Sequence, residues 1–263
     1  MKVALFVFFL LFISYYNSYS QLSVQKFRHI EESKNLSESE LKNQCDKLDF
    51  SKLLNHTDNS VIYGFIGNDY QRIRIKFIAI SKNPSSPELY DVYGKSMVKN
   101  NIDEFHGTIK ISKILKLKVI KHGCENGYLF KGMKGEYSIL GDYTFSENKS
   151  QTHSGVFKGN FRSDYFINKH NNIQYDDIEN CSDGYTNNQF IGEWKSYDGN
   201  TIKKCNWGDF RIPNSGNLDI GAGEFSPDDK YLAFGWQSRR DYSIQTSPKY
   251  KQAKKIEEAK WWL

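Results

Sequence analysis

The sequence lacks the short motifs that mark the familiar enzyme classes. It contains no Gly-x-Ser-x-Gly elbow of serine hydrolases, no glycine-rich nucleotide loop and no His-Glu-x-x-His zinc motif. Its four cysteines include no C-x-x-C pair or other metal-ligand spacing, which argues against zinc. The sequence leaves open whether the protein is an enzyme, and favours a protein that is not.

Long apolar runs are absent after the N-terminus. The first residues contain Lys2, an apolar run over residues 3–13, and small Ser18 and Ser20 before Gln21, which is the pattern of a secretory signal over residues 1–20. A bilayer-spanning helix needs about 20 apolar residues, so we expect no transmembrane span. The mature protein is expected to be secreted, periplasmic or held in the cell envelope.

A basic domain is also missing. The net charge is +5, but residues 239–263 hold seven Lys/Arg against three Asp/Glu, and residues 21–238 hold 28 of each. We therefore expect no nucleic-acid partner. The basic tail predicts a helix with one face formed by Ala253, Ile256, Ala259 and Leu263. Its Trp261 and Trp262 either dock onto the protein's own domain or contact an anionic membrane peripherally.

Four cysteines in an exported chain predict two disulfides. Three connectivities exist for Cys45, Cys124, Cys181 and Cys205. We favour Cys181 with Cys205, which are closest in sequence, and Cys45 with Cys124, which would tie the N-terminal extension to the body.

From Val61 onward, alternating aromatic and β-branched segments are separated by Gly, Asn, Asp and Ser clusters. Turns are predicted at Asn100-Asn101, residues 147–150, residues 168–172 and Asp198-Gly199. In the segment Ile73–Phe77 the apolar side chains are expected to be buried, and Arg72, Arg74 and Lys76 to face water. We predict an all-β protein, an antiparallel meander closing into a barrel, with a two-sheet sandwich as the alternative. The expected organisation is a signal (1–20), an N-terminal extension (21–55), a β domain (56–237) and a basic C-terminal tail or helix (238–263).

Two short segments resemble known families. "FSPDDKYLAFGW", residues 225–236, resembles one strand and turn of a TolB-type β-propeller blade. Because a propeller repeats its blade at a fixed period and this segment occurs once, only a turn and a final strand, Lys230 to Trp236, are predicted from it. "GEW", residues 192–194, resembles the Gly-x-Trp signature of lipocalins, but that signature lies on the first barrel strand, so no functional residue follows from it.

Catalytic candidates come from two patterns. His106 and His153 each lie just before the return glycine of a hairpin, where two imidazoles at one rim can act as acid and base or bind a metal. Glu136, Glu193 and Glu224 each lie between a glycine and an aromatic residue, and paired carboxylates beside aromatic rings are typical of glycosidases. The alternative for the glutamates is simple alternation, with Glu facing solvent and the aromatic residue facing the core.

One acidic segment suggests a cation. Asp176, Asp177, Glu179 and Asp183 lie close together in the sequence, and clustered carboxylates suit calcium. The alternative is a solvated acidic loop. No other cofactor is predicted.

Lysines and aromatic residues supply the remaining signals. Lys110, Lys113, Lys116, Lys118 and Lys121 occur with no acidic residue among them, and we expect them to protect an exposed edge strand rather than to bind an acidic ligand. Aromatic residues make up 15% of the chain. Among them Tyr143, Tyr165, Trp194 and Trp207 are candidates for holding a ligand.

These features predict a binding protein for a small apolar molecule or a carbohydrate, held in or at the mouth of the barrel. The alternatives are an exported, glycan-directed hydrolase, and a surface protein that acts on a partner through its basic tail.

Overall fold

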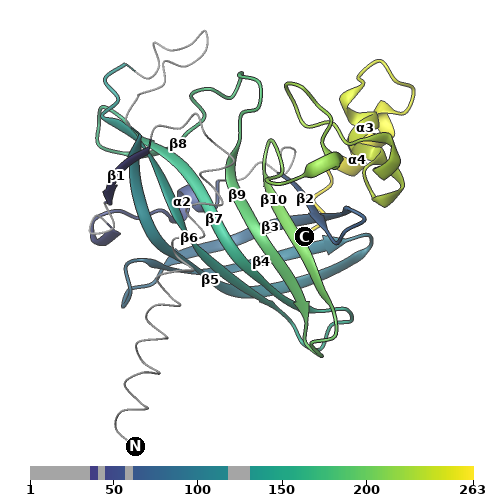
Figure 1. Cartoon of the computed structure of the whole chain (residues 1–263), viewed down its shortest axis with the longest axis horizontal. Coiled ribbons are helices and arrows are strands. Elements are labelled where there is room, and N and C mark those ends of the chain that lie inside the picture. The colour runs from purple at the N-terminus through teal and green to yellow at the C-terminus, as the bar shows by residue number, and fades with distance from the viewer. Residues whose placement is uncertain (1–35, 41–44, 57–61, 118–130) are drawn as a thin grey trace, which may run out of the picture.

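The computed structural model of the 263-residue chain describes residues 36–40, 45–56, 62–117 and 131–263. The protein is mostly β (Figure 1). The strands are β1 (Leu36–Glu40), β2 (Ile62–Ile66), β3 (Gln71–Lys82), β4 (Leu89–Val98), β5 (Asn101–Leu117), β6 (Gly135–Glu147), β7 (Gly155–Ile167), β8 (Ile173–Tyr175), β9 (Asn187–Ser196) and β10 (Ile202–Asp209). The helices are α2 (Ser51–Leu54), the 3-10 helices η3 (Gly216–Leu218) and η4 (Asp229–Phe234), α3 (Gln237–Ser243) and α4 (Tyr250–Glu257).

The strands form one antiparallel sheet whose pairings close in a ring. Along the sheet the order is β5-β4-β3-β2-β10-β9-β7-β6, and β6 pairs again with β5. Strand β1 adds to β5, and the short β8 adds to β7. The all-β prediction is confirmed. Because the order closes through the β5–β6 pairing, backbone groups that would be exposed at the edges of an open meander are paired.

The predicted hairpins are confirmed, although the β4–β5 turn lies at Lys99-Asn100, one residue before the predicted Asn100-Asn101. Val98 pairs with Asn101 in β4–β5, Ser146 with Val156 in β6–β7, and Lys195 with Ile202 in β9–β10. The β7–β8 hairpin turns over residues 168–172, as expected.

Alternate side chains of the strands fill the ring interior. The largest contributors are Phe77, Phe105, Tyr143, Phe145, Phe157, Phe161, Phe190 and Trp207, each at most 3% exposed. At one end of the ring, the segment that leads into α2 packs Phe50, Leu53 and Leu54 into the same core. The interior is therefore a packed aromatic core closed at that end by α2.

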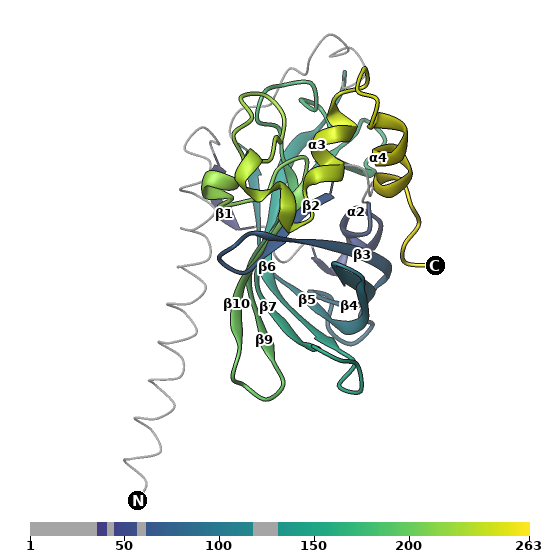
Figure 2. The same cartoon turned by 90° about the vertical axis from the view of Figure 1, so that its right-hand side faces the viewer.

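A second, smaller core lies outside the ring. Tyr63 and Phe65 on β2 pack against residues from the segment after β10, namely Ile212, Leu218, Phe225 and Trp236. Helices α3 and α4 lie together beside this core (Figures 1 and 2). Residues 210–262 thus form a C-terminal module docked on the outer face of β2 and β3.

An ion pair joins this module to β3. Arg72 contacts Glu257 of α4 through two short contacts, Nη1 to Oε1 at 2.8 Å and Nη2 to Oε2 at 2.6 Å. Arg74 Nη2 reaches Glu257 Oε1 at 3.1 Å, and the Ser238 hydroxyl donates to the same oxygen at 2.5 Å. The expectation that Arg72 and Arg74 face water is wrong, because the C-terminal module covers their side of β3.

The module also corrects two predictions about the C-terminus. The predicted final strand, Lys230 to Trp236, is the 3-10 helix η4, whose N-cap Asp228 accepts a hydrogen bond from the Lys230 amide and which ends at left-handed Gly235. The predicted basic helix is confirmed as α4, but its buried residues are Ala253 and Glu257. Ile256 and Leu263 are exposed, because the ion pair rather than an apolar stripe orients the helix.

The cysteine prediction is wrong for Cys205. This residue is fully buried in the ring interior as a free thiol, so it is not the partner of the disulfide-bonded Cys181. The other favoured pair, Cys45 with Cys124, includes a residue outside the described ranges. Cys205 lies on the inward side of β10, two residues before Trp207, and belongs to the same core cluster as the aromatic residues of the ring interior.

The lysine strip is not on an edge. Lys110, Lys113 and Lys116 belong to β5, which pairs with both β4 and β6, while Lys118 and Lys121 lie outside the described residues. The predicted protection of an edge strand is therefore wrong for this strand.

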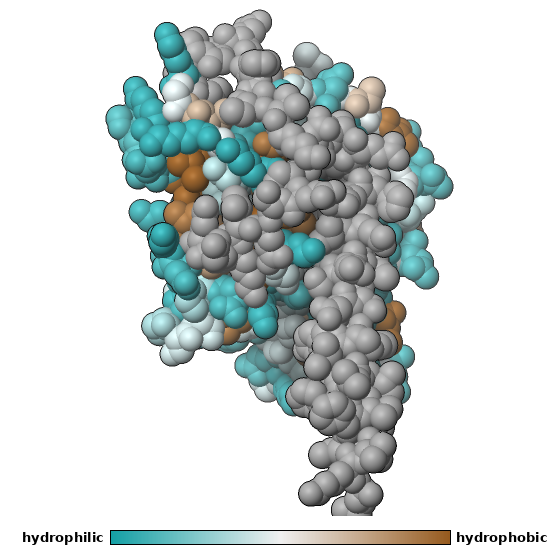
Figure 3. Space-filling model, turned by 60° about the vertical axis from the view of Figure 1, so that its left-hand side comes forward, coloured by the Kyte–Doolittle hydropathy of each residue, from teal (hydrophilic) through white to brown (hydrophobic). Residues whose placement is uncertain are grey.

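On the face shown in Figure 3, the described surface is mostly hydrophilic, and hydrophobic residues form small separate patches.

Candidate functional site

Two buried carboxylates lie at the ring end opposite α2. Glu147 ends β6, Asp103 lies near the start of β5, and both occupy inward positions of their strands. The register places Asp103 opposite Ser96 of β4, and Phe105 opposite Glu147. Trp194 of β9 completes the group, which we call the acidic end: Ser96, Asp103, Glu147 and Trp194.

Glu147 is held entirely by neutral donors. Ser96 Oγ donates to Oε1 at 2.5 Å, while the Gly155 amide and the Trp194 indole Nε1 donate to Oε2 at 2.9 and 2.8 Å. The side chain is 5% exposed. Burial raises the pKa of Glu147 above its ordinary value, against the hydrogen bonds from Ser96 and Trp194, and the charge of Asp103 raises it further.

Among the described residues, only one of the two carboxylate oxygens of Asp103 accepts a hydrogen bond. Asn101 Nδ2 donates to Oδ2 at 2.5 Å, whereas Oδ1 is buried and has no hydrogen-bond partner among the described residues. Burial raises the pKa of this carboxyl, while the Asn101 hydrogen bond and nearby His153 lower it. In the described part of the chain, no Lys or Arg pairs with either Asp103 or Glu147.

Two turns form the rim of the acidic end. His153, in the β6–β7 turn, is exposed and adopts a left-handed backbone conformation with φ 62°, which a residue with a Cβ adopts at a cost. Tyr197, at the β9–β10 turn, donates its hydroxyl to the Glu147 carbonyl at 2.5 Å, and Lys149 lies over its ring at 5.0 Å. The rim therefore offers an imidazole, an ammonium group and an exposed aromatic ring.

The four ligand-binding candidates all face the ring interior. Tyr143, Tyr165 and Trp207 are at most 2% exposed and Trp194 is 8% exposed. Phe190 stacks on Trp207 with ring centroids 4.9 Å apart, and Tyr143 contacts Trp207 edge-on at 5.1 Å. A side chain at Gly192 would place its Cβ 2.5 Å from Tyr143 Oη, so the glycine makes room for the tyrosine.

Three of these candidates carry a buried polar atom without a partner among the described residues. These atoms are Tyr143 Oη, Tyr165 Oη and Trp207 Nε1. Most buried polar groups in proteins are hydrogen-bonded, so each exception calls for an explanation. Trp194 differs because its indole nitrogen is bonded to Glu147, which makes it the candidate that belongs to the acidic end.

The predicted catalytic residues do not come together. His106 is exposed on β5 and stacks on Tyr93 at 4.7 Å, whereas His153 lies at the rim beside Asp103. Glu193 is exposed on the outer side of β9 and Glu224 on a loop of the C-terminal module, each next to a buried aromatic residue. Simple alternation explains those two glutamates, but not Glu136, which is fully buried on β6.

The predicted calcium ligands are not gathered into one group of three or more side chains. Asp176 is buried, and its Oδ1 accepts a hydrogen bond from the Ile178 amide at 3.3 Å. Asp177 and Asp183 are exposed, and Glu179 is half-buried. Among the described residues no group of three or more His, Cys, Asp or Glu side chains is arranged to hold a metal ion.

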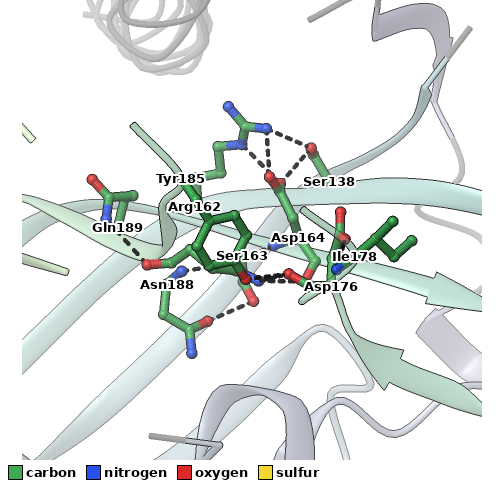
Figure 4. A network of polar contacts seen from close by, with 10 residues as sticks. Ser138, Arg162, Ser163, Asp164, Asp176, Ile178, Tyr185, Asn188 and Gln189 are labelled. Atoms are coloured by element: carbon green, nitrogen blue, oxygen red, sulfur yellow. Dashed lines mark hydrogen bonds and ion pairs between the residues drawn. The ribbon is translucent and has the colours of Figure 1, made fainter. Parts of the chain in front are cut away.

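Asp176 belongs instead to a buried polar network around β7 (Figure 4). Arg162 Nε and Nη2 bind Asp164 at 2.8 and 2.7 Å, and Ser138 donates to Asp164 at 2.6 Å. Asn187 Nδ2 links the Asp164 and Asp176 carbonyls at 3.0 and 3.2 Å. Because the Arg162 guanidinium neutralises the Asp164 carboxylate within the network, we interpret the network as structural.

Sequence reasoning missed Asp103 and Glu147. The sequence contains a signal for both, because each lies two residues from a core phenylalanine and therefore on the same side of its strand. Asp103 is two residues before Phe105, and Glu147 is two residues after Phe145. An acidic residue at an inward position is rare enough to deserve a functional hypothesis.

No described helix is long and apolar enough to cross a bilayer. Comparison with known proteins gave no match, since no protein-family model, no curated protein and no solved structure is similar to the chain. The function must therefore be argued from the acidic end itself.

Proposed function

We propose that this is an exported, non-catalytic binding protein whose ligand is a small hydroxylated molecule of the carbohydrate class. The ligand binds at the acidic end of the ring. The observation that carries the proposal is the buried Oδ1 of Asp103, which accepts no hydrogen bond from the described residues. It lies next to a second buried carboxylate, that of Glu147, which has no basic partner among the same residues.

A purely structural role does not account well for this pair. Burying a carboxylate without an opposite charge is costly, and two carboxylates that interact raise the cost for both. An apolar or hydroxyl side chain at residue 103 would close the ring end at lower cost. Groups with raised pKa values in such places are typical of functional sites.

Hydroxyl groups fit the acidic end better than an apolar ligand does. The interior above it is filled with aromatic side chains, which leaves the rim and the carboxylates as the binding surface. Carboxylate oxygens accept hydrogen bonds from hydroxyls, while an exposed aromatic ring such as that of Tyr197 stacks on the apolar face of a sugar. Tyr197 is 36% exposed, so its ring is accessible from solvent.

Calorimetric titration of the mature chain with a panel of neutral mono- and disaccharides tests the proposal. We expect at least one sugar to bind, and D103N to weaken that binding tenfold or more, because the amide replaces one carboxylate acceptor with a donor. The matched control is E193Q, which removes an exposed carboxylate from the outer side of β9 and should bind as the unaltered protein does. Absence of binding across the panel, or equal binding by D103N, would count against the proposal.

A glycan-directed hydrolase is the second candidate. It is favoured by one observation, namely that both acidic-end carboxyls have raised pKa values, and a protonated acid beside a second carboxylate is the equipment for glycoside cleavage. The same sugar panel, extended to oligosaccharides and followed by product chromatography, separates the two candidates. Release of shorter sugars that is lost in E147Q favours the hydrolase, and binding without products favours the binding protein.

A further inference from the structure

We propose that Asn148, in the turn between β6 and β7, is an acceptor for N-linked glycosylation. The proposal goes beyond the binding function and depends only on passage of the chain through a secretory pathway that glycosylates. It rests on the sequence around Asn148, its exposure, and the hydrogen bonds of its side chain.

The acceptor pattern Asn-x-Ser/Thr, with x not proline, occurs at four positions: Asn35, Asn55, Asn148 and Asn180. Asn83 fails the pattern because Pro84 follows it. Asn35 lies outside the described residues. The structure separates the other three.

Asn55 and Asn180 are poor acceptors. Asn55 is half-buried at the end of α2, and its Oδ1 is buried, so a glycan there would have to displace packed residues. Asn180 is exposed, but the middle residue of its pattern, Cys181, is disulfide-bonded. That bond ties the acceptor segment to the folded chain.

Asn148 meets each requirement. It is exposed, as are Lys149 and Ser150, at the tip of a long hairpin. Its backbone is fixed by hydrogen bonds, from its amide to the Glu104 carbonyl at 3.1 Å and from the Gln151 amide to its own carbonyl at 3.0 Å. A glycan at this position projects from an ordered turn without covering any core residue.

The side-chain hydrogen bonds favour the amide nitrogen as the nucleophile. Both the amide and the hydroxyl of Ser150 donate to Asn148 Oδ1, at 3.0 and 2.8 Å, while Nδ2 makes no hydrogen bond to the described residues. A hydroxyl bonded to the amide oxygen draws electron density from the carbonyl and makes an Nδ2 proton easier to remove.

Transfer of the oligosaccharide to Asn148 Nδ2 exchanges one bond for another. The co-reactant is an oligosaccharide linked through its reducing-end C1 to a polyprenol pyrophosphate. The Nδ2–C1 bond forms as the C1–O bond to the phosphate breaks, the lipid pyrophosphate leaves with the bonding electron pair, and one Nδ2 proton passes to a base of the transferring enzyme. No oxidation or reduction occurs.

Peptide mapping of the full chain, purified from its own host, tests the proposal. We expect the peptide that contains Asn148 to carry a glycan, and an N-glycan amidase to convert that residue to Asp. N148Q and S150A should lose this glycan completely, whereas S150T should keep it, because threonine also satisfies the pattern. All three changes lie on an exposed turn and should leave the fold intact.

An unmodified Asn148 peptide in the secreted chain would overturn the proposal, whether or not Asn55 or Asn180 is modified. Recovery of the chain only as an unmodified intracellular protein would overturn it as well, because passage through the secretory pathway is its premise. The glycan is detected by peptide mapping and sugar binding by calorimetry of the unaltered protein, so the two proposals fail separately.

Discussion

The indole nitrogen of Trp194 donates a hydrogen bond to Glu147 Oε2 over 2.8 Å, at the acidic end of the strand ring. Together with the Gly155 amide on the same oxygen and the Ser96 hydroxyl on Oε1, it gives Glu147 three neutral donors and no cation within the described residues. Neutral donors compensate only part of the cost of burying a charge. The protonation state of Glu147 should therefore affect both stability and binding.

Replacement of Glu147 by glutamine should remove a pH dependence of stability. The folded-state pKa is raised above the ordinary 4.5, so the folded protein binds more protons than the unfolded chain above about pH 4.5. Its free energy of unfolding must then fall as the pH rises from 4.5 through the folded pKa. In E147Q the amide oxygen can accept from Gly155 and Trp194 while the amide nitrogen donates to Ser96 Oγ, so the fold is kept and this fall is lost.

Urea unfolding of the unaltered protein and E147Q between pH 4.5 and 8 measures the effect. The control is E193Q, whose curve should run parallel to that of the unaltered protein because Glu193 is exposed. A curve for E147Q that also runs parallel would show that Glu147 titrates as it does in the unfolded chain.

Glu257 should show the opposite pH dependence. Burial would raise its pKa, but the hydrogen bonds and charges of Arg72 and Arg74 lower it to about 2 from an ordinary 4.5. The corresponding stabilisation is roughly 3 kcal/mol. It is present above pH 4.5 and lost as the pH falls towards 2. E257Q should therefore lower the free energy of unfolding at pH 7 by a similar amount, because it leaves two arginines buried without a full counter-charge.

The matched control is E258Q on the same helix. Glu258 is half exposed and pairs with Lys254 at 3.5 Å, an arrangement worth about 0.5 kcal/mol or less. Hydrogen exchange should locate the E257Q effect in α3 and α4, which would lose their anchor on β3. Equal, small effects of both substitutions would mean that the C-terminal module is held by its apolar core alone.

Local patterns in the sequence predicted the parts of this fold that local chemistry determines. The hairpin turn at Asp198-Gly199 follows from residues that prefer turns between alternating strands, and it is found. The turn predicted at Asn100-Asn101 is found one residue earlier, at Lys99-Asn100. Helix α4 follows from its helix-forming residues. Their prediction required no information about the segments that pack against them.

The predictions that are wrong concern residues whose burial or conformation is determined by a segment far away in the sequence. Arg72 and Arg74 have the alternation of a solvent-facing side, yet Glu257, more than 180 residues later, buries them. The segment Lys230–Phe234 has β-favouring residues but folds as η4 because it must pack over β2 and β3. The acidic end was missed for the same reason, since Asp103, Glu147 and Trp194 become neighbours only when the ring closes.

His153 should carry a backbone strain that glycine relieves. Its φ of 62° suits glycine better than any residue with a Cβ. H153G is therefore expected to unfold with a free energy about 1 kcal/mol above that of H153A. Both variants remove the imidazole that lowers the pKa of Asp103, so carbon-13 NMR titration should show a higher Asp103 pKa in each. An unchanged Asp103 pKa would place the imidazole too far away to act on the acidic end.

Cys205 should resist modification until the ring opens. Its side chain is 0% exposed, and burial raises the pKa of its thiol well above the ordinary 9.0. Since the thiolate is the reactive form, native protein treated with a maleimide should yield an unlabelled Cys205 peptide. Addition of denaturant without any reductant should label it fully. Labelling in the native protein would indicate that the interior opens on the timescale of the reaction. A peptide that stays unlabelled in denaturant would mean that Cys205 is in a disulfide, and would restore the pairing that its place inside the aromatic core contradicts.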